Sequence, residues 1–229
     1  MKDSSIELIK KHFCLDDSKL EKGSNVIGFS EQLKKEIMLF ELFKNFIIYS
    51  DINIFNIIKK NKRMTIDKAT KTIGKNSEID VMNDERYYFL DEETKWKPQH
   101  TEGLTIRNLK EEDKKIVETL KKKCKSNEVE MGQVNLYDIC PIGGFIGNKL
   151  VGIASILNID EIYDIGVIVH PQHRNLGIGR SLVTHVIAYS IIHNKVVRYL
   201  TTTKNGSSMG IAKALDLPEI VRYRKIKLK

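Results

Sequence analysis

The chain has 229 residues, of which 41% are hydrophobic and 30% charged, and a formal net charge of +8 at pH 7. It is longer than a usual single domain of about 100–150 residues, so we expect two domains, 1–100 and 101–229, joined near residues 95–103. Charged residues interrupt every apolar run before it reaches the ~18 residues of a membrane-spanning helix, and the N-terminus lacks the apolar core of a secretory signal. We therefore expect a cytoplasmic protein with no membrane partner.

The positive charge is concentrated in the second half of the chain. Residues 101–229 carry 20 Lys and Arg against 13 Asp and Glu, which is +7 of the total +8. A basic half suits a polyanionic ligand. No helix-turn-helix, RNA-recognition or zinc motif accompanies the charge, so we do not expect a nucleic-acid partner.

The first hundred residues show mostly helical spacing. Apolar residues recur at three- and four-residue intervals over residues 31–50, and the pattern continues through residues 51–60. Residues 64–75 predict a further helix and residues 78–90 a strand. The N-terminal domain is thus predicted to be largely helical, with a role that its sequence leaves open.

The cysteines and histidines do not form a metal-binding pattern. Cys14, Cys124 and Cys140 have no CxxC spacing, and the six histidines have no HxxxH or HExxH spacing. An odd number of cysteines cannot all pair within one chain. We expect reduced thiols, as in the cytoplasm, and no metal.

The most informative segment is Val167–Leu182. It begins in a β-branched and aromatic strand, residues 163–169, which Pro171 ends because proline has no N–H for the ladder. Gly177 and Gly179 follow, and glycine lets the backbone turn sharply and approach a ligand closely. The apolar spacing then becomes helical. This order predicts a strand, a glycine-bearing turn and a helix.

A turn of this kind provides a seat for an anion. The first N–H groups of a helix have no internal partner, and the helix N-terminus carries a partial positive charge. Arg174 and Arg180 add formal charge beside the turn. A phosphate is the expected ligand class.

The pattern Arg174-x-x-Gly177-x-Gly179, preceded by Val-x-Val-His-Pro and followed by an apolar helix, resembles the acetyl-CoA signature of the GNAT acetyltransferase superfamily. In that signature Arg/Gln-x-x-Gly-x-Gly/Ala holds the coenzyme pyrophosphate. The dinucleotide fingerprint GxGxxG and the Walker pattern GxxxxGK[ST] are both absent.

The elements predicted around this motif can be compared with that fold. Residues 104–107 favour a strand and residues 110–125 a charged helix. Two strands then flank the turn Gly147-Asn148, a hairpin signal. After the motif come a strand, a short helix and a closing strand: 195–201, 207–215 and 220–228. This order predicts an α/β mixed sheet with helices on its faces, and over about residues 103–229 it resembles the GNAT acyl-CoA N-acyltransferase fold.

The resemblance implies acetyl-CoA as co-substrate and the residues that bind it. The backbone of the strand would pair with the pantetheine amides as an added strand does. The turn would cover the pyrophosphate, and Asn205 and Ser208 match a helix-entry motif that contacts the coenzyme. The implied contacts are Val167, Ile168, Val169, Arg174, Asn175, Leu176, Gly177, Ile178, Gly179, Arg180, Asn205 and Ser208.

The resemblance also implies direct transfer of an acetyl group to an amine, without a covalent enzyme intermediate. Such a reaction needs a base to neutralise the amine. The candidate bases are Glu161 and Asp164 at the start of the strand and Glu130 in the preceding region. Family members often place a tyrosine near the coenzyme sulfur, but this chain has Ala212 at that position. A thiol with a pKa near 8.5 can leave without strong acid help.

Several readings of the function remain open from sequence. The first is an N-acetyltransferase for a small-molecule or peptide amine. The second, favoured by Ala212, is a catalytically silent acyl-CoA sensor or regulatory module, and the third is a nucleic-acid-binding protein. Residues 1–100 would cap the acceptor side, form a homodimer interface or be a degenerate copy of the second domain.

Overall fold

A computed structural model describes residues 1–13, 25–29, 33, 35–43, 45–50 and 64–229. The chain divides into two compact units, which are considered separately. Unit 1 comprises residues 1–8, 89–199 and 211–217, and unit 2 comprises residues 9–88, 200–210 and 218–229. The boundary expected between residues 100 and 101 stays a prediction.

Unit 1 is built on a mixed sheet in the order β5-β6-β7-β8-β9. The first four strands are antiparallel, whereas β8 and β9 are parallel. The bounds are β5 Thr105–Asn108, β6 Ile139–Ile146, β7 Lys149–Ile159, β8 Ile162–Val169 and β9 Val197–Thr202, the last residues of β9 belonging to unit 2. These strands confirm the α/β mixed sheet predicted for the second half of the chain.

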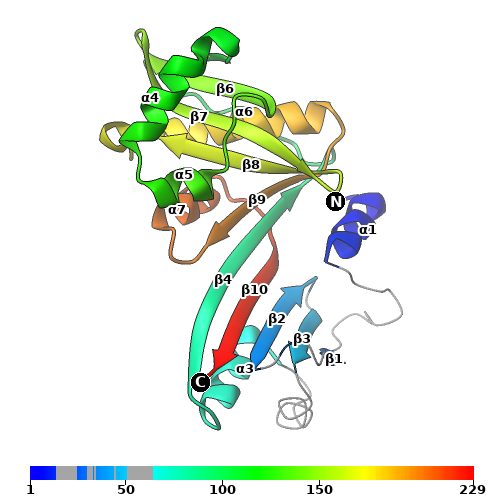
Figure 1. The fold of residues 1–229 in the computed structure, drawn as a ribbon. Coiled ribbons are helices and arrows are strands. Elements are labelled where there is room, and N and C mark those ends of the chain that lie inside the picture. The colour runs from blue at the N-terminus through cyan, green and yellow to red at the C-terminus, as the bar shows by residue number, and fades with distance from the viewer. Residues whose placement is uncertain (14–24, 30–32, 34, 44, 51–63) are drawn as a thin grey trace. The chain divides into compact units, whose positions relative to one another are not determined.

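Helices cover both faces of this sheet (Figure 1). The helix α4 (Lys114–Lys123), preceded by the 3-10 turn η2 (Glu111–Asp113), lies on one face, and α6 (Ile178–Ile192) lies on the other. A core on the α4 side joins Val117 and Leu120 to Ile153 and Ile168 of the sheet. The helices predicted at residues 110–125 and after the glycine turn are therefore present.

A short helix, α5 (Ser126–Gly132), follows α4 and was not predicted. Its seven residues are mostly polar, so the sequence offers too few apolar positions to show a helical period. Its C-terminal end packs closely on β8 at Gly166. A Cβ atom on Gly166 would collide with the Gly132 carbonyl oxygen and lie 2.6 Å from that of Gln133. Only glycine fits at this point of the strand.

Unit 2 contains a second set of strands, in the order β1-β3-β2-β10-β4. Here β1 and β3 are parallel, and the other pairs are antiparallel. The bounds are β1 Asn25–Phe29, β2 Glu36–Leu42, β3 Asn45–Ser50, β4 Ile79–Leu90 and β10 Glu219–Leu228, with Phe89 and Leu90 of β4 counted in unit 1. The strands predicted at 78–90 and 220–228 are confirmed.

The helix predicted over residues 31–50 is wrong, since β2 and β3 occupy the described part of this segment. Both faces of β2 make apolar contacts: Ile37 and Leu39 lie in a buried core, while the Phe40 ring contacts Tyr223 and Tyr49. A strand with two apolar faces lacks the alternation that identifies strands. Its partner β10 lies about 180 residues further along the chain, and local spacing cannot reveal such a partner.

The remaining N-terminal expectations have mixed outcomes. The helix expected at 64–75 is α3 (Ile66–Gly74), and α1 (Asp3–His12) was not predicted. The helix expected at residues 51–60 lies outside the described residues. The described part of the first hundred residues is therefore not largely helical.

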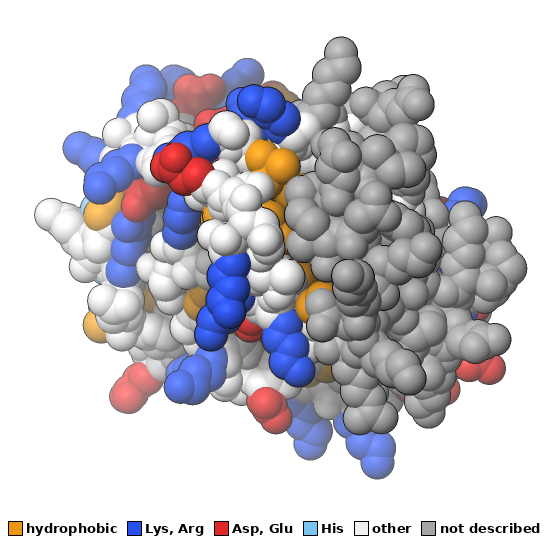
Figure 2. Space-filling model, turned by 90° about the horizontal axis from the view of Figure 1, so that it is seen from below, with side chains coloured by type: hydrophobic (Ala, Val, Ile, Leu, Met, Phe, Trp, Pro, Cys, Tyr) orange, Lys and Arg blue, Asp and Glu red, His pale blue; other side chains and the backbone are white. Residues whose placement is uncertain are grey.

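The basic C-terminal strand lies in an ion-pair network within unit 2. Arg222 pairs with Glu41 and Asp67, and Arg224 pairs with Asp67 and Asp84. On the face shown in Figure 2, Lys and Arg side chains are interspersed with Asp and Glu. The positive charge of β10 is thus partly compensated inside its own unit.

None of the described helices combines the length and the apolar character that crossing a bilayer requires.

Replacement of Gly166 by alanine tests the packing of α5 on β8. The added methyl group would collide with two backbone carbonyls, so we expect Gly166→Ala to lower the free energy of unfolding by about 1–3 kcal/mol, measured by urea denaturation. The control is Gly210→Ala, where a Cβ meets no atom within 4 Å and the change should be neutral or slightly stabilising. An equal effect of the two substitutions would contradict the close packing.

Candidate functional site

The turn between β8 and α6 has an unusual backbone. His170 caps the 3-10 turn η3 (Pro171–His173), and its Nδ1 accepts a hydrogen bond from the Gln172 N–H. Further along, Asn175 has φ = 62° and Gly177 has φ = 80°. Two left-handed residues so close together bend the chain back on itself and let successive N–H groups point into one concavity.

The amides of residues 175–180 are left without partners inside the described part of the chain. After His173, whose N–H donates to the His170 carbonyl oxygen, the next N–H with a backbone acceptor among the described residues is that of Ser181, which donates to the Gly177 carbonyl oxygen at 2.9 Å. No described residue accepts a hydrogen bond from the N–H groups of residues 175–180. Such a row of donors at the N-terminus of a 15-residue helix has the geometry that favours an anion, and the phosphate site expected here stays a prediction.

Two further observations fit a phosphate at this turn. A Cβ atom on Gly179 would lie 3.0 Å from Ile211 Cδ1 and 3.4 Å from Val169 Cγ2, so the backbone there is closely confined. The Arg180 Nε atom is buried and has no hydrogen-bond partner among the described residues. A partnerless donor beside partnerless amides is what an anionic ligand would satisfy.

The guanidinium of Arg174 is engaged within the protein. It forms two hydrogen bonds with Glu128 of α5, at 2.8 and 2.9 Å, and its Nε donates to the Val169 carbonyl oxygen at 3.2 Å. The arginine lowers the pKa of Glu128 to about 2, chiefly through these hydrogen bonds. Arg174 thus links the turn to α5 and to the end of β8. The backbone N–H groups of the turn, rather than this side chain, are then the groups that could bind an anion.

One edge of β8 offers free backbone groups. The His170 N–H donates to the Val151 carbonyl oxygen, toward β7. Because backbone groups alternate between the two edges of a strand, those of Val167 and Val169 face away from β7. On that side the described register with β9 covers only Tyr163 with Val197 and Asp164 with Arg198. The Val169 carbonyl is taken by Arg174, but the N–H groups of Val167 and Val169 and the Val167 carbonyl face an edge with no registered strand.

Asp164 lies at the end of the β8–β9 register and is not a free carboxylate. Its Oδ1 accepts from Arg198 Nε at 2.9 Å and its Oδ2 from Arg198 Nη2 at 2.8 Å. Each of the two side chains is 7% exposed. A buried, bidentate pair of this kind ties β8 to β9, and its carboxylate is poorly placed to take a proton from a substrate.

The other two candidate bases are exposed. Glu161 lies in the turn between β7 and β8 with φ = 71°, and about eight residues, or roughly 26 Å of strand, separate it from Val169. Glu130 lies on α5, two residues before Gly132. A Cβ on Gly132 would touch Ile168 Cγ2 and lie 3.1 Å from the Val167 carbonyl oxygen. Of the three candidates, Glu130 is therefore on the element that covers the middle of β8.

The helix α7 (Gly206–Ala214) begins with the cap that the sequence suggested. The Asn205 Oδ1 accepts from the Ser208 N–H at 3.1 Å. Both residues belong to unit 2, so their relation to the turn stays a prediction. Ala212 is 1% exposed, so the position at which the family often has a tyrosine is filled and apolar.

Two contributions to this region were missed in the sequence. Glu128 and Arg198 are ordinary charged residues in the sequence, and only tertiary contacts reveal their partners. The segment expected to be a linker also packs on α6: Trp96 Nε1 donates to the Thr184 carbonyl oxygen at 3.1 Å, and Thr101 shares a 2.8 Å hydrogen bond with Ser181. The sequence signal for this packing was that Trp96 and Thr101 each carry a side-chain group able to form a hydrogen bond, an indole N–H and a hydroxyl. Across the described residues, no cluster of three or more His, Cys, Asp or Glu side chains could hold a metal ion.

Comparison with known proteins identifies the domain. Residues 114–215 match the model of the acetyltransferase (GNAT) family. With the fold of unit 1, this match shows that the chain contains a GNAT acetyltransferase domain. A search of the curated proteins found no match to the sequence.

Solved structures of GNAT acetyltransferases have a similar fold. A GCN5-related N-acetyltransferase from Sphaerobacter thermophilus has a TM-score of 0.53 at 16% identity, over 70% of this chain and 55% of that one. A GNAT-family acetyltransferase from Colwellia psychrerythraea has a TM-score of 0.51 at 15% identity, over 70% and 61%. A GCN5-related N-acetyltransferase from Kribbella flavida has a TM-score of 0.50 at 12% identity, over 69% and 63%. This chain therefore spans less than two thirds of each of these three, and at such identities the likeness shows the fold alone.

The pair Asp164–Arg198 allows a test that separates a structural role from a catalytic one. Asp164→Asn removes the carboxylate that pairs with the buried Arg198 side chain, so we expect a loss of about 3–5 kcal/mol in the free energy of unfolding. The double variant Asp164→Leu with Arg198→Met should recover much of that loss, because no charge is then left buried. If Asp164→Asn instead keeps its stability in urea denaturation and loses turnover alone, Asp164 is a base.

Proposed function

We propose that this protein is an N-acetyltransferase that moves an acetyl group from acetyl-CoA directly to an amine of a small molecule or peptide. The observation that supports it most is the row of partnerless amides at residues 175–180, beside the buried donor of Arg180. These groups match the charge and the hydrogen-bonding needs of a diphosphate. The GNAT domain at residues 114–215 makes a coenzyme A ester the expected source of that diphosphate.

The residues of β8 would bind the rest of the coenzyme through the backbone. The free groups of Val167 and Val169 can pair with an extended amide-bearing ligand, as an added strand would. When bound, acetyl-CoA supplies the activated thioester for acyl transfer. A backbone N–H on this edge, such as that of Val167, can stabilise negative charge that develops on an acyl oxygen.

Glu130 is the carboxylate that we propose as the base. An aliphatic ammonium group has a pKa near 10, so at neutral pH it must lose a proton before it can attack. Glu130 is exposed and lies on α5, which covers β8 between the turn and the Asp164–Arg198 pair. It can therefore pass the proton to solvent. Glu161 is distant along the strand, and Asp164 is occupied by Arg198.

The second candidate function is a catalytically silent acyl-CoA sensor. It is favoured by two observations: Ala212 is buried where the family often has a tyrosine, and Asp164 is neutralised by a buried arginine. A sensor needs the phosphate seat and the free edge of β8, but no base. Binding and turnover measurements distinguish the two functions.

Substitution of Gly179 tests the coenzyme seat. Gly179→Val places a branched side chain against Ile211 and Val169, where a single Cβ already approaches to 3.0 Å, so we expect coenzyme A affinity to fall at least about tenfold by calorimetry. Gly210→Val is the control, because the space around its Cβ is open. Unchanged affinity in a folded Gly179→Val protein would refute the seat.

Turnover with a panel of amines tests the transferase itself. We expect release of free coenzyme A thiol from acetyl-CoA only when a suitable amine is present, and Glu130→Gln should lower kcat by about 100-fold, in the range of a lost general base. Glu161→Gln is the matched control and should leave kcat unchanged. Tight coenzyme binding without turnover for any amine would favour the sensor.

A further inference from the structure

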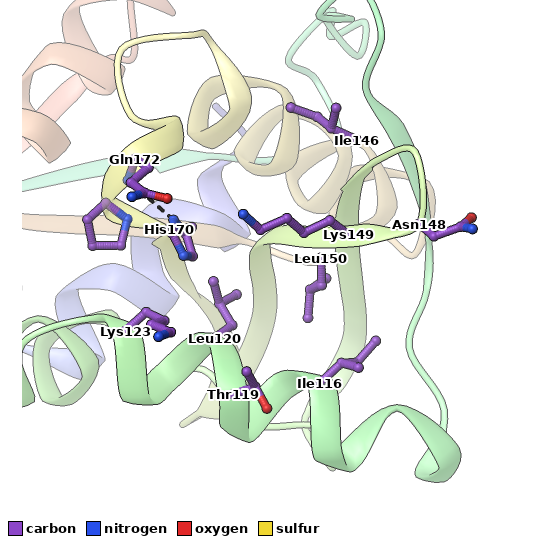
Figure 3. Close-up of a pocket in the computed structure, with 11 residues that line it drawn as sticks. Ile116, Thr119, Leu120, Lys123, Ile146, Asn148, Lys149, Leu150, His170 and Gln172 are labelled. Carbon is purple, nitrogen blue, oxygen red and sulfur yellow. Dashed lines mark hydrogen bonds between the residues drawn. The ribbon is translucent and has the colours of Figure 1, made fainter.

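A groove lies in unit 1 on the α4 side of the sheet (Figure 3). It is beside residues 170–172, which begin the turn between β8 and α6; we call this turn the phosphate turn, after the ligand proposed for it. Its volume is about 920 Å³, and it is open to solvent on one side. Its floor is apolar, formed by Ile116, Leu120 and Leu150, of which the last two are almost fully buried. A cavity of this size can hold a small organic ligand.

The groove has a cationic rim. The groove is lined by Lys123 from the end of α4, Lys149 from the start of β7 and His170, which directly follows β8. Figure 3 shows the Lys149 side chain extending toward His170, with Lys123 on the same side of the groove. Neither lysine forms an ion pair with any residue that the structure describes. Acidic side chains are missing from the lining of the groove.

The positive potential of this rim acts on His170. Burial lowers the pKa of the imidazole, and repulsion from Lys149, His173, Lys123 and Arg174 lowers it further. Glu128 pairs with Arg174, but no acidic side chain among the described residues acts to raise the His170 pKa. His170 is 8% exposed, and its Nδ1 is already used as an acceptor for the Gln172 N–H. The groove therefore holds concentrated positive charge above an apolar floor, a combination that attracts an anion with an apolar body.

We propose that this groove is a binding site for a small amphipathic anion, such as a carboxylate with an aliphatic chain, separate from the phosphate seat. The carboxylate lies between Lys123 and Lys149, and the chain covers the apolar floor. The phosphate seat is formed by amides of residues 175–180, none of which lines the groove. The groove and the phosphate seat are neighbours along the chain, because His170, Pro171 and Gln172, which line the groove, come directly before the turn of residues 174–177. The proposal does not depend on acetyl transfer.

The test compares hexanoate with 1-hexanol, which has the same aliphatic chain without the charge. We expect hexanoate to bind by calorimetry at least about fivefold more tightly than the alcohol, and its affinity to fall as salt is raised. Lys123→Gln and Lys149→Gln should each weaken hexanoate binding by about fivefold. Lys122→Gln is the matched control, because this neighbour on α4 does not line the groove.

The position of the ligand can be read at His170 by NMR. An anion beside the imidazole raises its pKa, so the His170 titration should shift upward when hexanoate is added to the wild-type protein and less in Lys149→Gln. Equal binding of hexanol and hexanoate, an equal loss in Lys122→Gln, or an unchanged His170 titration would each overturn the proposal.

A competition experiment with coenzyme A tests whether the groove is part of the coenzyme site. Saturating coenzyme A should leave hexanoate binding in place. The proposal fails if coenzyme A displaces hexanoate and the two lysine variants weaken the binding of coenzyme A more than the binding of 3′-dephospho-coenzyme A. The groove would then bind the nucleotide end of the coenzyme. The proposal also fails if hexanoate does not bind and an acidic, apolar peptide does, because the groove is then a protein-docking surface.

Discussion

The buried pair of Asp164 and Arg198 fixes the point at which β8 and β9 stop being registered. A bidentate contact between side chains that are each 7% exposed is hard to break, because separation would leave a buried charge without its partner. Beyond this point the odd-numbered residues of β8 present backbone groups to an edge with no registered strand. The unregistered edge of β8, which the proposed coenzyme site uses, begins where this register ends.

The helix α5 connects the parts of the site. Its first turn contacts the phosphate turn through Glu128 and Arg174, and its last turn rests on Gly166 at the middle of β8. Both contacts are specific: one is a paired charge with two hydrogen bonds, and the other excludes any side chain larger than hydrogen. A movement of α5 would therefore change the phosphate turn and the centre of β8 together. This places Glu130 on an element whose position is set at both ends.

Charge has different consequences in the two units. In unit 2 the arginines of β10 face acidic side chains, so the basic C-terminal strand leaves little free potential at Arg222 and Arg224. In unit 1 the amides at residues 175–180 and the lysines of the groove have no acidic partners among the described residues. Unpaired positive groups in concave places are the features that attract anions. The net charge of the chain alone could not show this difference.

The sequence by itself determined the strand-turn-helix of residues 163–192 and, apart from α5, the order of elements in the second half of the chain. Strong local signals specify them: β-branched runs, Pro171, paired glycines and helical spacing. It failed for β2 and β3, whose apolar residues lie on both faces, and β2 also pairs with β10, which is distant in sequence. The partners of Asp164 and Arg174 could not be predicted for the same reason, because Arg198 and Glu128 are distant from them in the sequence. Sequence indicates that a residue is charged, but only the tertiary structure decides which countercharge it meets, because ion pairs form between residues brought together by folding.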